Sequence, residues 1–506
     1  MKKVKAHYFA SLILLFFCSS YLFWTCKKDP APEPIPEPWE GGIELPPRSV
    51  IAVDFSPMSG SWLYGGLQGD YSLTGRVNAY KNIIAGMVDL GVNALMDDAF
   101  DEQRDKDNMA AIAQAVREYN QEHDAKFSWF ILAEPFNSST GVFDNFWGVE
   151  ALKQYGHGPD YATKNGKPIF AVWNGGASQA TAGQYINDLL TPLKSAGFDP
   201  YFLYESGLYP NTIANNVRIM RQAGYDVNFY VFGTDSSQAN IDRTLTLQDA
   251  MGQYGATVFP GVSPAYWQVC GRDRSNYIEH EGSKGLFRFW NALLPPNGVL
   301  KDKDMVFLTE YSDLSEDHHL VPQVQIPPAP YGGSVAYVVP GGFNGNTDMP
   351  IWTHRGFREA QKRLIKSYRL GEVQPIVKDK IFYSYRQHPK DLPAPTGCEC
   401  VEAGTPITGI ENAKDEVYLT TELTAPATLT VNLGGVQIGS WDLNAGVSHV
   451  EAPWGANRGQ PQIILTRAGE TVLSATGALS ITNTPLAYDG EGTRNFGTYA
   501  DFVEGN

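Results

Sequence analysis

Eight apolar runs of strand length alternate with helical patterns from residue 49 onward, and this alternation constrains the fold more than any other feature of the chain. Seven of the runs are near-continuous in apolar or aromatic residues, as expected for strands covered on both faces. The runs span Ser49–Phe55, Asn93–Asp98, Phe127–Glu134, Pro168–Trp173, Pro200–Glu205, Asn228–Thr234, Thr257–Ser263 and Met305–Tyr311.

Helical periodicity fills the gaps between these runs. The predicted helices are Arg76–Leu90, Asp107–Tyr119, Gln179–Ser195, Thr212–Ala223, Asn240–Gln253, Gly285–Leu294 and Phe357–Leu370. Alternating strands and helices predict a parallel α/β sheet, and eight such units predict a closed (β/α)8 barrel of the TIM type. A dinucleotide or nucleotide-triphosphate fold is disfavoured, because no G-x-G-x-x-G follows the first strand and no Walker A sequence is present.

The pattern changes after residue 392. Short strand-like runs such as Val417–Thr420, Ala427–Val431 and Ile463–Leu465 follow a Pro-rich stretch and are separated by Gly and Asn turns. This predicts a β-sandwich over 393–506 behind a catalytic barrel over 48–392. The simplest role for the sandwich is to stabilise the barrel, although Trp441 and Trp454 leave open a sugar-binding role.

The first 26 residues are typical of an export signal. Three lysines precede an apolar run that ends at Cys26, and a Pro-rich linker over 27–47 follows. A cysteine in this position resembles a bacterial lipidation site, which predicts a lipid anchor at Cys26 and a protein held on the cell envelope, at the outer-membrane surface or facing the periplasm. An uncleaved membrane anchor is the alternative, and it predicts nearly the same topology.

The formal net charge is −16. This charge argues against nucleic acid and anionic membrane surfaces as partners, because they require a basic stripe. A neutral polymer such as a polysaccharide is compatible with this charge, and the 62 Trp, Tyr and Phe residues (11, 26 and 25) include candidates to carry sugar rings. No cofactor is predicted, and the oligomeric state is left open.

Acidic residues gather where the predicted strands end. Active sites of such barrels lie at the C-terminal ends of the strands, so a ring of acids there indicates a functional site. Any single acid could instead cap a helix or bind an arginine. The predicted sugar contacts at these positions, chosen by strand-end position alone, are Asp54, Asp97, Asp98, Glu134, Trp173, Glu205, Tyr266, Trp267 and His318, with Tyr204 among the interleaved aromatics.

Two carboxyl groups are the minimum that glycoside hydrolysis requires. One protonates the leaving oxygen, and the other activates water or attacks the sugar carbon. Metal catalysis is disfavoured, because His318 and His319 are adjacent and no H-E-x-x-H spacing is present, so no metal is predicted. A serine hydrolase is disfavoured by the absence of a G-x-S-x-G sequence.

Three segments resemble glycoside hydrolase family 71, the α-1,3-glucanases or mutanases, and occur in the order found in that family. The segment Tyr311–Pro322 (YSDLSEDHHLVP) is similar to the family's W-N-D-Y-G-E-S-H-Y-I-G-P, with matches at Asp313, Glu316, His318 and Pro322. The other two are Gly261–Trp267 (GVSPAYW), which resembles V-S-P-W-F-F, and Tyr385–Lys390 (YRQHPK), which resembles Y-R-P-H-P-K.

The resemblance implies an endo-acting hydrolase that inverts the anomeric carbon of an α-glucan, with Asp313 and Glu316 as the catalytic pair. Departures occur next to this pair, where Tyr311 and Ser312 replace Trp and Asn. Another occurs at Asp54, where fungal members carry His. Such changes can alter the sugar that is accepted. An α-1,3-glucan is the leading substrate, and a related α-linked polysaccharide is the next.

Two competing hypotheses remain. A glycan-binding lipoprotein without catalysis would keep the aromatics but would not need the acid pair Asp313 and Glu316. An endo-hydrolase of another α-glycan, such as α-mannan, would share the barrel but not the ordered segments. The family resemblance favours the α-1,3-glucan hydrolase over both.

Overall fold

The computed structural model describes most of the chain after residue 40. The described residues are 41–55, 71–99, 103–134, 136–137, 142–143, 146–173, 180–205, 210–233, 236–271, 274–278, 281–309, 311–312, 320, 335–339, 349–393, 404–405, 410–484 and 498–505.

Parallel strands close into the predicted barrel. Their order around it is β11, β10, β9, β8, β4, β3, β2, β15, β12, in which β11 and β12 are two halves of one strand. Each strand coincides with one of the eight apolar runs. The strands are β2 (Ser49–Phe55), β3 (Ala94–Ala99), β4 (Ser128–Ala133), β8 (Lys167–Trp173), β9 (Tyr201–Glu205), β10 (Val227–Tyr230), β11 (Val258–Phe259) with β12 (Gly261–Val262), and β15 (Met305–Leu308).

The barrel closes at Pro260, between β11 and β12. The first half pairs with β10, where the Val231 amide donates to the Phe259 carbonyl at 2.9 Å. The second half pairs with β15, where the Phe307 amide donates to the Pro260 carbonyl at 2.9 Å. Proline has no amide hydrogen to give to a ladder, so it suits the point at which the strand changes partner.

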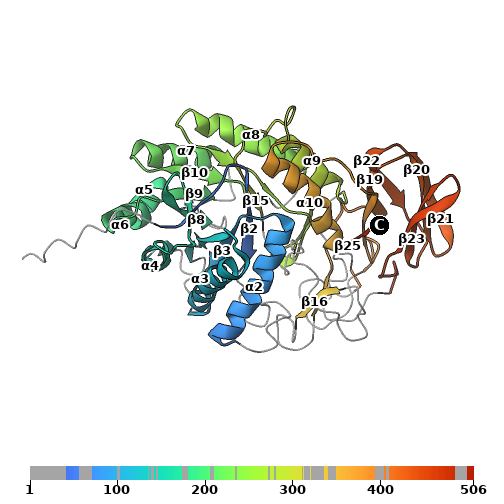
Figure 1. Cartoon of the computed structure of the whole chain (residues 1–506), viewed down its shortest axis with the longest axis horizontal. Helices are drawn as coiled ribbons and strands as arrows, with labels where there is room; N and C mark the ends of the chain where they lie inside the picture. Colours follow the sequence, from blue (N-terminus) through green and yellow to red (C-terminus); the bar gives the residue numbers. More distant parts are fainter. Residues whose placement is uncertain are drawn as a thin grey trace, which may run out of the picture.

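Helices cover the outside of the barrel (Figure 1). All seven predicted helices are present, although η1 breaks the third with a π-turn, and α4 was not predicted. They are α2 (Leu73–Leu90), α3 (Gln103–His123), α4 (Phe146–Tyr155), α5 (Ala182–Tyr185) with η1 (Ile186–Leu190) and α6 (Thr191–Ser195), α7 (Pro210–Gln222), α8 (Gln238–Gly252), α9 (Lys284–Leu293) and α10 (Arg355–Leu370).

Short elements decorate this framework. One small strand pair, β1 (Ile43–Glu44) with β7 (Ala162–Lys164), is parallel, and it places the end of the predicted linker against the barrel. The antiparallel hairpins are β5 (Phe136–Asn137) with β6 (Val142–Phe143), β13 (Tyr266–Gly271) with β14 (Arg274–Ile278), and β16 (Val335–Val339) with β17 (Met349–Trp352).

The C-terminal region forms the predicted β-sandwich of two four-stranded antiparallel sheets. Leu429, Val431 and Leu433 alternate with polar residues along β20 and lie in its core. One sheet has the order β22 (Gly446–Pro453), β19 (Glu416–Leu423), β18 (Lys380–Arg386), β25 (Thr498–Glu504). The other has the order β21 (Val436–Leu443), β20 (Ala427–Leu433), β23 (Pro461–Arg467), β24 (Glu470–Thr476).

The strand β18 precedes the predicted boundary at residue 393 and nevertheless pairs with β19 and β25 of the sandwich. The family-like segment Tyr385–Lys390 begins within it. The Tyr385 hydroxyl donates to the Leu479 carbonyl at 2.8 Å, and Arg386 donates to Asp415 at 2.8 Å. These contacts give that segment a structural role inside the sandwich. The domain limits themselves stay a prediction.

The sandwich docks on helix α10, which lies between it and the barrel (Figure 1). Arg355 pairs with Asp501 at 2.6 Å, and Arg363 pairs with Glu422 at 2.6 Å. Phe382 of β18 and Ala500 of β25 belong to the same buried cluster as the barrel strands. The two parts therefore share apolar surface as well as charge pairs.

The predicted export signal, the lipidation site at Cys26 and the linker up to residue 40 lie outside the described residues. Among the residues that the structure describes, no helix is both long enough and apolar enough to span a membrane. The anchor and the envelope location stay predictions.

Barrel closure depends on two glycines that have no room for a side chain. A Cβ on Gly261 would meet the Val231 carbonyl oxygen at 2.1 Å, and a Cβ on Gly233 would meet the Gly261 oxygen at 2.1 Å. We expect Gly261→Ala to lower the free energy of unfolding by about 1–3 kcal/mol, because the backbone must shift to admit the methyl group. Chemical denaturation measures this change.

The matched control is Gly183→Ala in α5, where the nearest atom to the added Cβ is at 3.7 Å. Alanine is favoured over glycine in a helix by about 1 kcal/mol, so this variant should be at least as stable as the parent chain. Equal stability of Gly261→Ala and the parent would contradict the role assigned to the close approach.

Candidate active site

Strand register determines which side chains face the barrel interior. The rings of Tyr230 in β10 and Phe307 in β15 lie 5.0 Å apart although β11 and β12 separate their strands, so both point inward. Phe307 pairs in register with Ile51 of β2. Because side chains alternate along a strand, Val53 also points inward and Asp54 points outward.

The predicted acids therefore fall on two different faces. Asp54 pairs in register with Asp97, so both carboxylates lie on the face that packs against the helices. Asp98 follows Asp97 and points into the barrel, in register with Leu132 of β4. Glu134 has the same parity as Leu132 and lies beside Asp98. The barrel mouth thus receives Asp98 and Glu134, but not Asp54 or Asp97.

Asp98 and Glu134 form a hydrogen-bonded carboxyl pair at the ends of β3 and β4. Burial is the main cause that raises the pKa of Glu134, and the charge of Asp98 and the bond to it raise it further. Two adjacent carboxyl groups hold a proton between them more readily than either does alone. The pair can therefore present both a donor and an acceptor to a sugar hydroxyl.

A second cluster stands across the mouth, at the ends of β8 and β9. Trp173 and Glu205 are in register and share the inward face. The Trp173 ring lies 5.8 Å from the ring of Phe232, and both are only partly buried. Glu205 is fully buried and pairs with Arg243 of α8 at 3.7 Å. Aromatic rings beside a charge pair can carry one face of a sugar and bind its hydroxyls.

Tyr204 lies on the other side of its strand from these residues. It pairs in register with Val172, and its hydroxyl accepts a hydrogen bond at 3.1 Å from Asn216 of α7. It is therefore a contact between the barrel and its helices, although its neighbour Glu205 faces the mouth.

The segment after β12 begins the hairpin of β13 and β14. Tyr266 is 7 % exposed, and Trp267 pairs in register with Tyr277. The family-like segment Gly261–Trp267 therefore supplies both the closing half-strand of the barrel and the start of a hairpin at its mouth.

The end of β15 carries Thr309, Tyr311 and Ser312. The Ser312 hydroxyl donates to Asp54 at 2.6 Å. The next residue is Asp313, and the predicted site residues Asp313, Glu316 and His318 lie outside the described residues. Within the described part of the chain, no group of three His, Cys, Asp or Glu residues could hold a metal ion.

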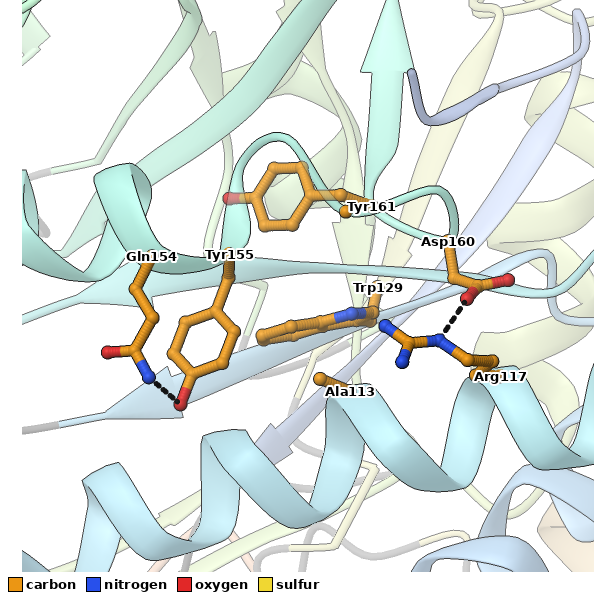
Figure 2. Close-up of a pocket in the computed structure, with 8 residues that line it drawn as sticks. Ala113, Arg117, Trp129, Gln154, Tyr155, Asp160 and Tyr161 are labelled. Carbon is orange, nitrogen blue, oxygen red and sulfur yellow. Dashed lines mark hydrogen bonds and ion pairs between the residues drawn. The ribbon is translucent and has the colours of Figure 1, made fainter.

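A small cavity of about 60 Å³ lies elsewhere, on the outside of the barrel between α3 and α4 (Figure 2). Its lining includes Trp129 near the start of β4, at the opposite end of that strand from Glu134. Its polar groups are paired with one another or with neighbours. Asp160 pairs with Arg117 at 3.5 Å, and Gln154 donates to the Tyr155 hydroxyl at 3.1 Å. The cavity is a packing feature remote from the mouth.

Sequence reasoning missed Arg243, Phe232 and Ser312. Arg243 lies in a helix, where an arginine is typical of a solvated face, and only the tertiary fold brings it to Glu205. Phe232 follows the end of β10 and could have been found by the same strand-end rule that selected Trp173. Nothing in the sequence pointed to Ser312 except its position directly before Asp313.

Acidic and aromatic clusters at the C-terminal ends of barrel strands make a site that suits glycoside hydrolysis. The model of the family described as glycosyl hydrolase family 71 matches residues 119–505. The chain belongs to that family, and the predicted class, glycoside hydrolase, is confirmed at this level.

Individual similar proteins are more distant. A mutanase, Pc12g07500 of Penicillium rubens, is 27 % identical over 205 residues, which is 40 % of this chain and 40 % of that protein. The chain thus matches less than half the length of this curated relative. Among solved structures, a GH99 endo-α-mannosidase from Bacteroides thetaiotaomicron has a TM-score of 0.43 at 14 % identity, covering 64 % of this chain and 98 % of that one.

The carboxyl pair at the mouth predicts a pH dependence of stability. The folded-state pKa of Glu134 lies above its ordinary value of 4.5, so above that pH the folded protein holds the proton more tightly than the unfolded chain does. Stability therefore falls as pH rises from about 4.5 through the raised pKa. We expect Glu134→Gln to remove this loss, so that its melting temperature relative to the parent increases with pH in that window.

Thermal unfolding of both proteins at a series of pH values measures the difference. Glu150→Gln, on the exposed face of α4, is the control for the same substitution at a surface position. A difference in melting temperature between Glu134→Gln and the parent that does not vary with pH would rule out a raised pKa of Glu134 in the folded protein.

Proposed function

We propose that this protein hydrolyses α-1,3-glucan, cutting within the chain and inverting the anomeric carbon, with Asp313 and Glu316 as the catalytic carboxyl pair. The observation that carries the proposal is the family match, whose range includes both residues. The mutanase similarity adds support for this linkage.

The strand geometry is compatible with that assignment. Tyr311 and Ser312 directly precede Asp313 and follow β15, so the chain leaves the barrel at its C-terminal, mouth end. Active-site residues of such barrels come from these strand ends. In an inverting pair, one carboxyl protonates the leaving oxygen while the other activates a water on the opposite face of the sugar ring.

The two clusters at the mouth suit sugar binding around that chemistry. We assign Trp173 and Phe232 as a platform for a sugar ring, since both are partly exposed and adjacent. The buried Glu205, paired with Arg243, and the Asp98–Glu134 pair supply polar contacts for hydroxyl groups. Polar contacts to substrate hydroxyls discriminate between sugars more strongly than apolar ones do.

A product assay tests the function. The protein would be incubated with insoluble α-1,3-glucan, mixed α-glucans, α-mannan and β-glucans, and released sugars would be followed by chromatography and anomeric NMR. We expect oligosaccharides of inverted configuration from α-1,3-glucan. Release of sugars only from another α-glycan would mean that this other glycan is the substrate. Glycan binding without release would indicate a glycan-binding protein without catalysis.

The catalytic pair is tested by Asp313→Asn and Glu316→Gln. Removal of a general acid or base typically costs at least about a hundredfold, so each variant should lose at least that much kcat on the substrate found. Asp317→Asn is the matched control, because it removes a carboxylate from the same stretch and should keep kcat within a few-fold. Full activity in either catalytic variant would refute the assignment.

A further inference from the structure

A buried hydrogen bond ties strand β2 to the point where the chain leaves β15. The Ser312 hydroxyl donates to the Asp54 carboxylate at 2.6 Å, and the two residues are 6 % and 0 % exposed. Bonds from a hydroxyl to a charged carboxylate are shorter and about twice as strong as neutral ones. By the alternation along β2, Asp54 lies on the helix side of the strand, and this bond joins it to the residue directly before Asp313.

Backbone contacts converge on the same point. The Tyr311 amide donates to the Val53 carbonyl at 2.6 Å, which extends the pairing of β15 with β2 by one further bond. The Leu320 amide donates to the Tyr311 carbonyl at 2.8 Å, and Leu320 is 1 % exposed. Leu320, nine residues after Tyr311, is therefore bonded back to it.

The Tyr311 ring is fixed from the helix layer. The Arg358 guanidinium of α10 lies close enough to its hydroxyl to act on it electrostatically, and it donates to the Gly86 carbonyl at 2.8 Å and to Asp89 at 2.6 Å. Helix α10 thus places a cation beside Tyr311, and α2 holds that cation in place. The bond from Ser312 to Asp54 then holds the side chain of the residue directly before Asp313.

We propose that Asp54 is a positioning residue, which sets the place of the catalytic segment through Ser312 rather than by touching sugar. The proposal rests on the proposed function, since it assumes that Asp313 is catalytic. Displacement of a catalytic group by about 1 Å can cost about a hundredfold in rate. Asp54 orients Ser312, the residue directly before Asp313, so its loss should lower kcat.

Kinetics of Asp54→Ala, Asp54→Asn and Ser312→Ala test this role. We expect Asp54→Ala and Ser312→Ala to lower kcat by about 10- to 100-fold with KM within about twofold. The double variant should be no slower than the worse single one, because both changes remove one interaction. Asp54→Asn keeps an oxygen that accepts from Ser312, so it should recover most of the lost kcat.

A second measurement does not depend on activity. Hydrogen exchange at the Leu320 amide, read in peptides spanning 311–322, should be faster in Asp54→Ala than in the parent, because the bond to Tyr311 opens more readily. Ser49→Ala is the matched control. It removes a part-buried bond of 2.6 Å, from Ser49 to the Pro46 carbonyl, at the opposite end of β2, and should change neither kcat nor Leu320 exchange.

A rise in KM with kcat unchanged in Asp54→Ala would overturn the proposal, because it would mean that Asp54 contacts substrate. Additive losses in the double variant, or unaltered Leu320 exchange, would also overturn it. If the parent protein hydrolyses no glycan, the proposed function fails, and the exchange result alone then decides whether Asp54 holds the segment.

Discussion

Closure of the barrel at Pro260 is the constraint on which the rest of the structure depends. Strand β11 completes the ladder with β10, and β12 completes it with β15, so the strand interrupted at Pro260 joins the sixth and eighth strands of the barrel. Gly233 and Gly261 make this possible, because their backbones come too close for a Cβ. A closed barrel has no strand edge, and it brings the ends of β3, β4, β8 and β9 around one mouth.

Much of this architecture could be predicted from the sequence. All eight strands follow from apolar runs, and the helix stops at Gly91 and Gly371 follow from glycines that adopt positive φ. The face of each strand-end acid could not be predicted. A one-residue difference, as between Asp97 and Asp98, moves a side chain from the helix layer to the mouth, and only the register with neighbouring strands decides which is which.

Acids at equivalent positions therefore serve different purposes. Asp54 bonds to Ser312 at the helix side of the barrel, whereas Glu134 shares a bond with Asp98 inside it. Glu205 is paired instead with a cation, Arg243, from a helix that no strand-end rule would include. The composition of the mouth is thus set by contributions from both layers of the barrel.

Helix α10 connects the sandwich to the barrel. Its Arg355 and Arg363 bind the sandwich, and its Arg358 donates to the Gly86 carbonyl and lies near Tyr311, which follows β15. Strand β18, placed before the Pro-rich stretch, already belongs to the sandwich sheet. An expression fragment that ends at the Pro-rich stretch would contain β18 without β19 and β25, its partner strands in the sheet. For the same reason, exchange of the sandwich at this boundary would leave one of its strands with the barrel.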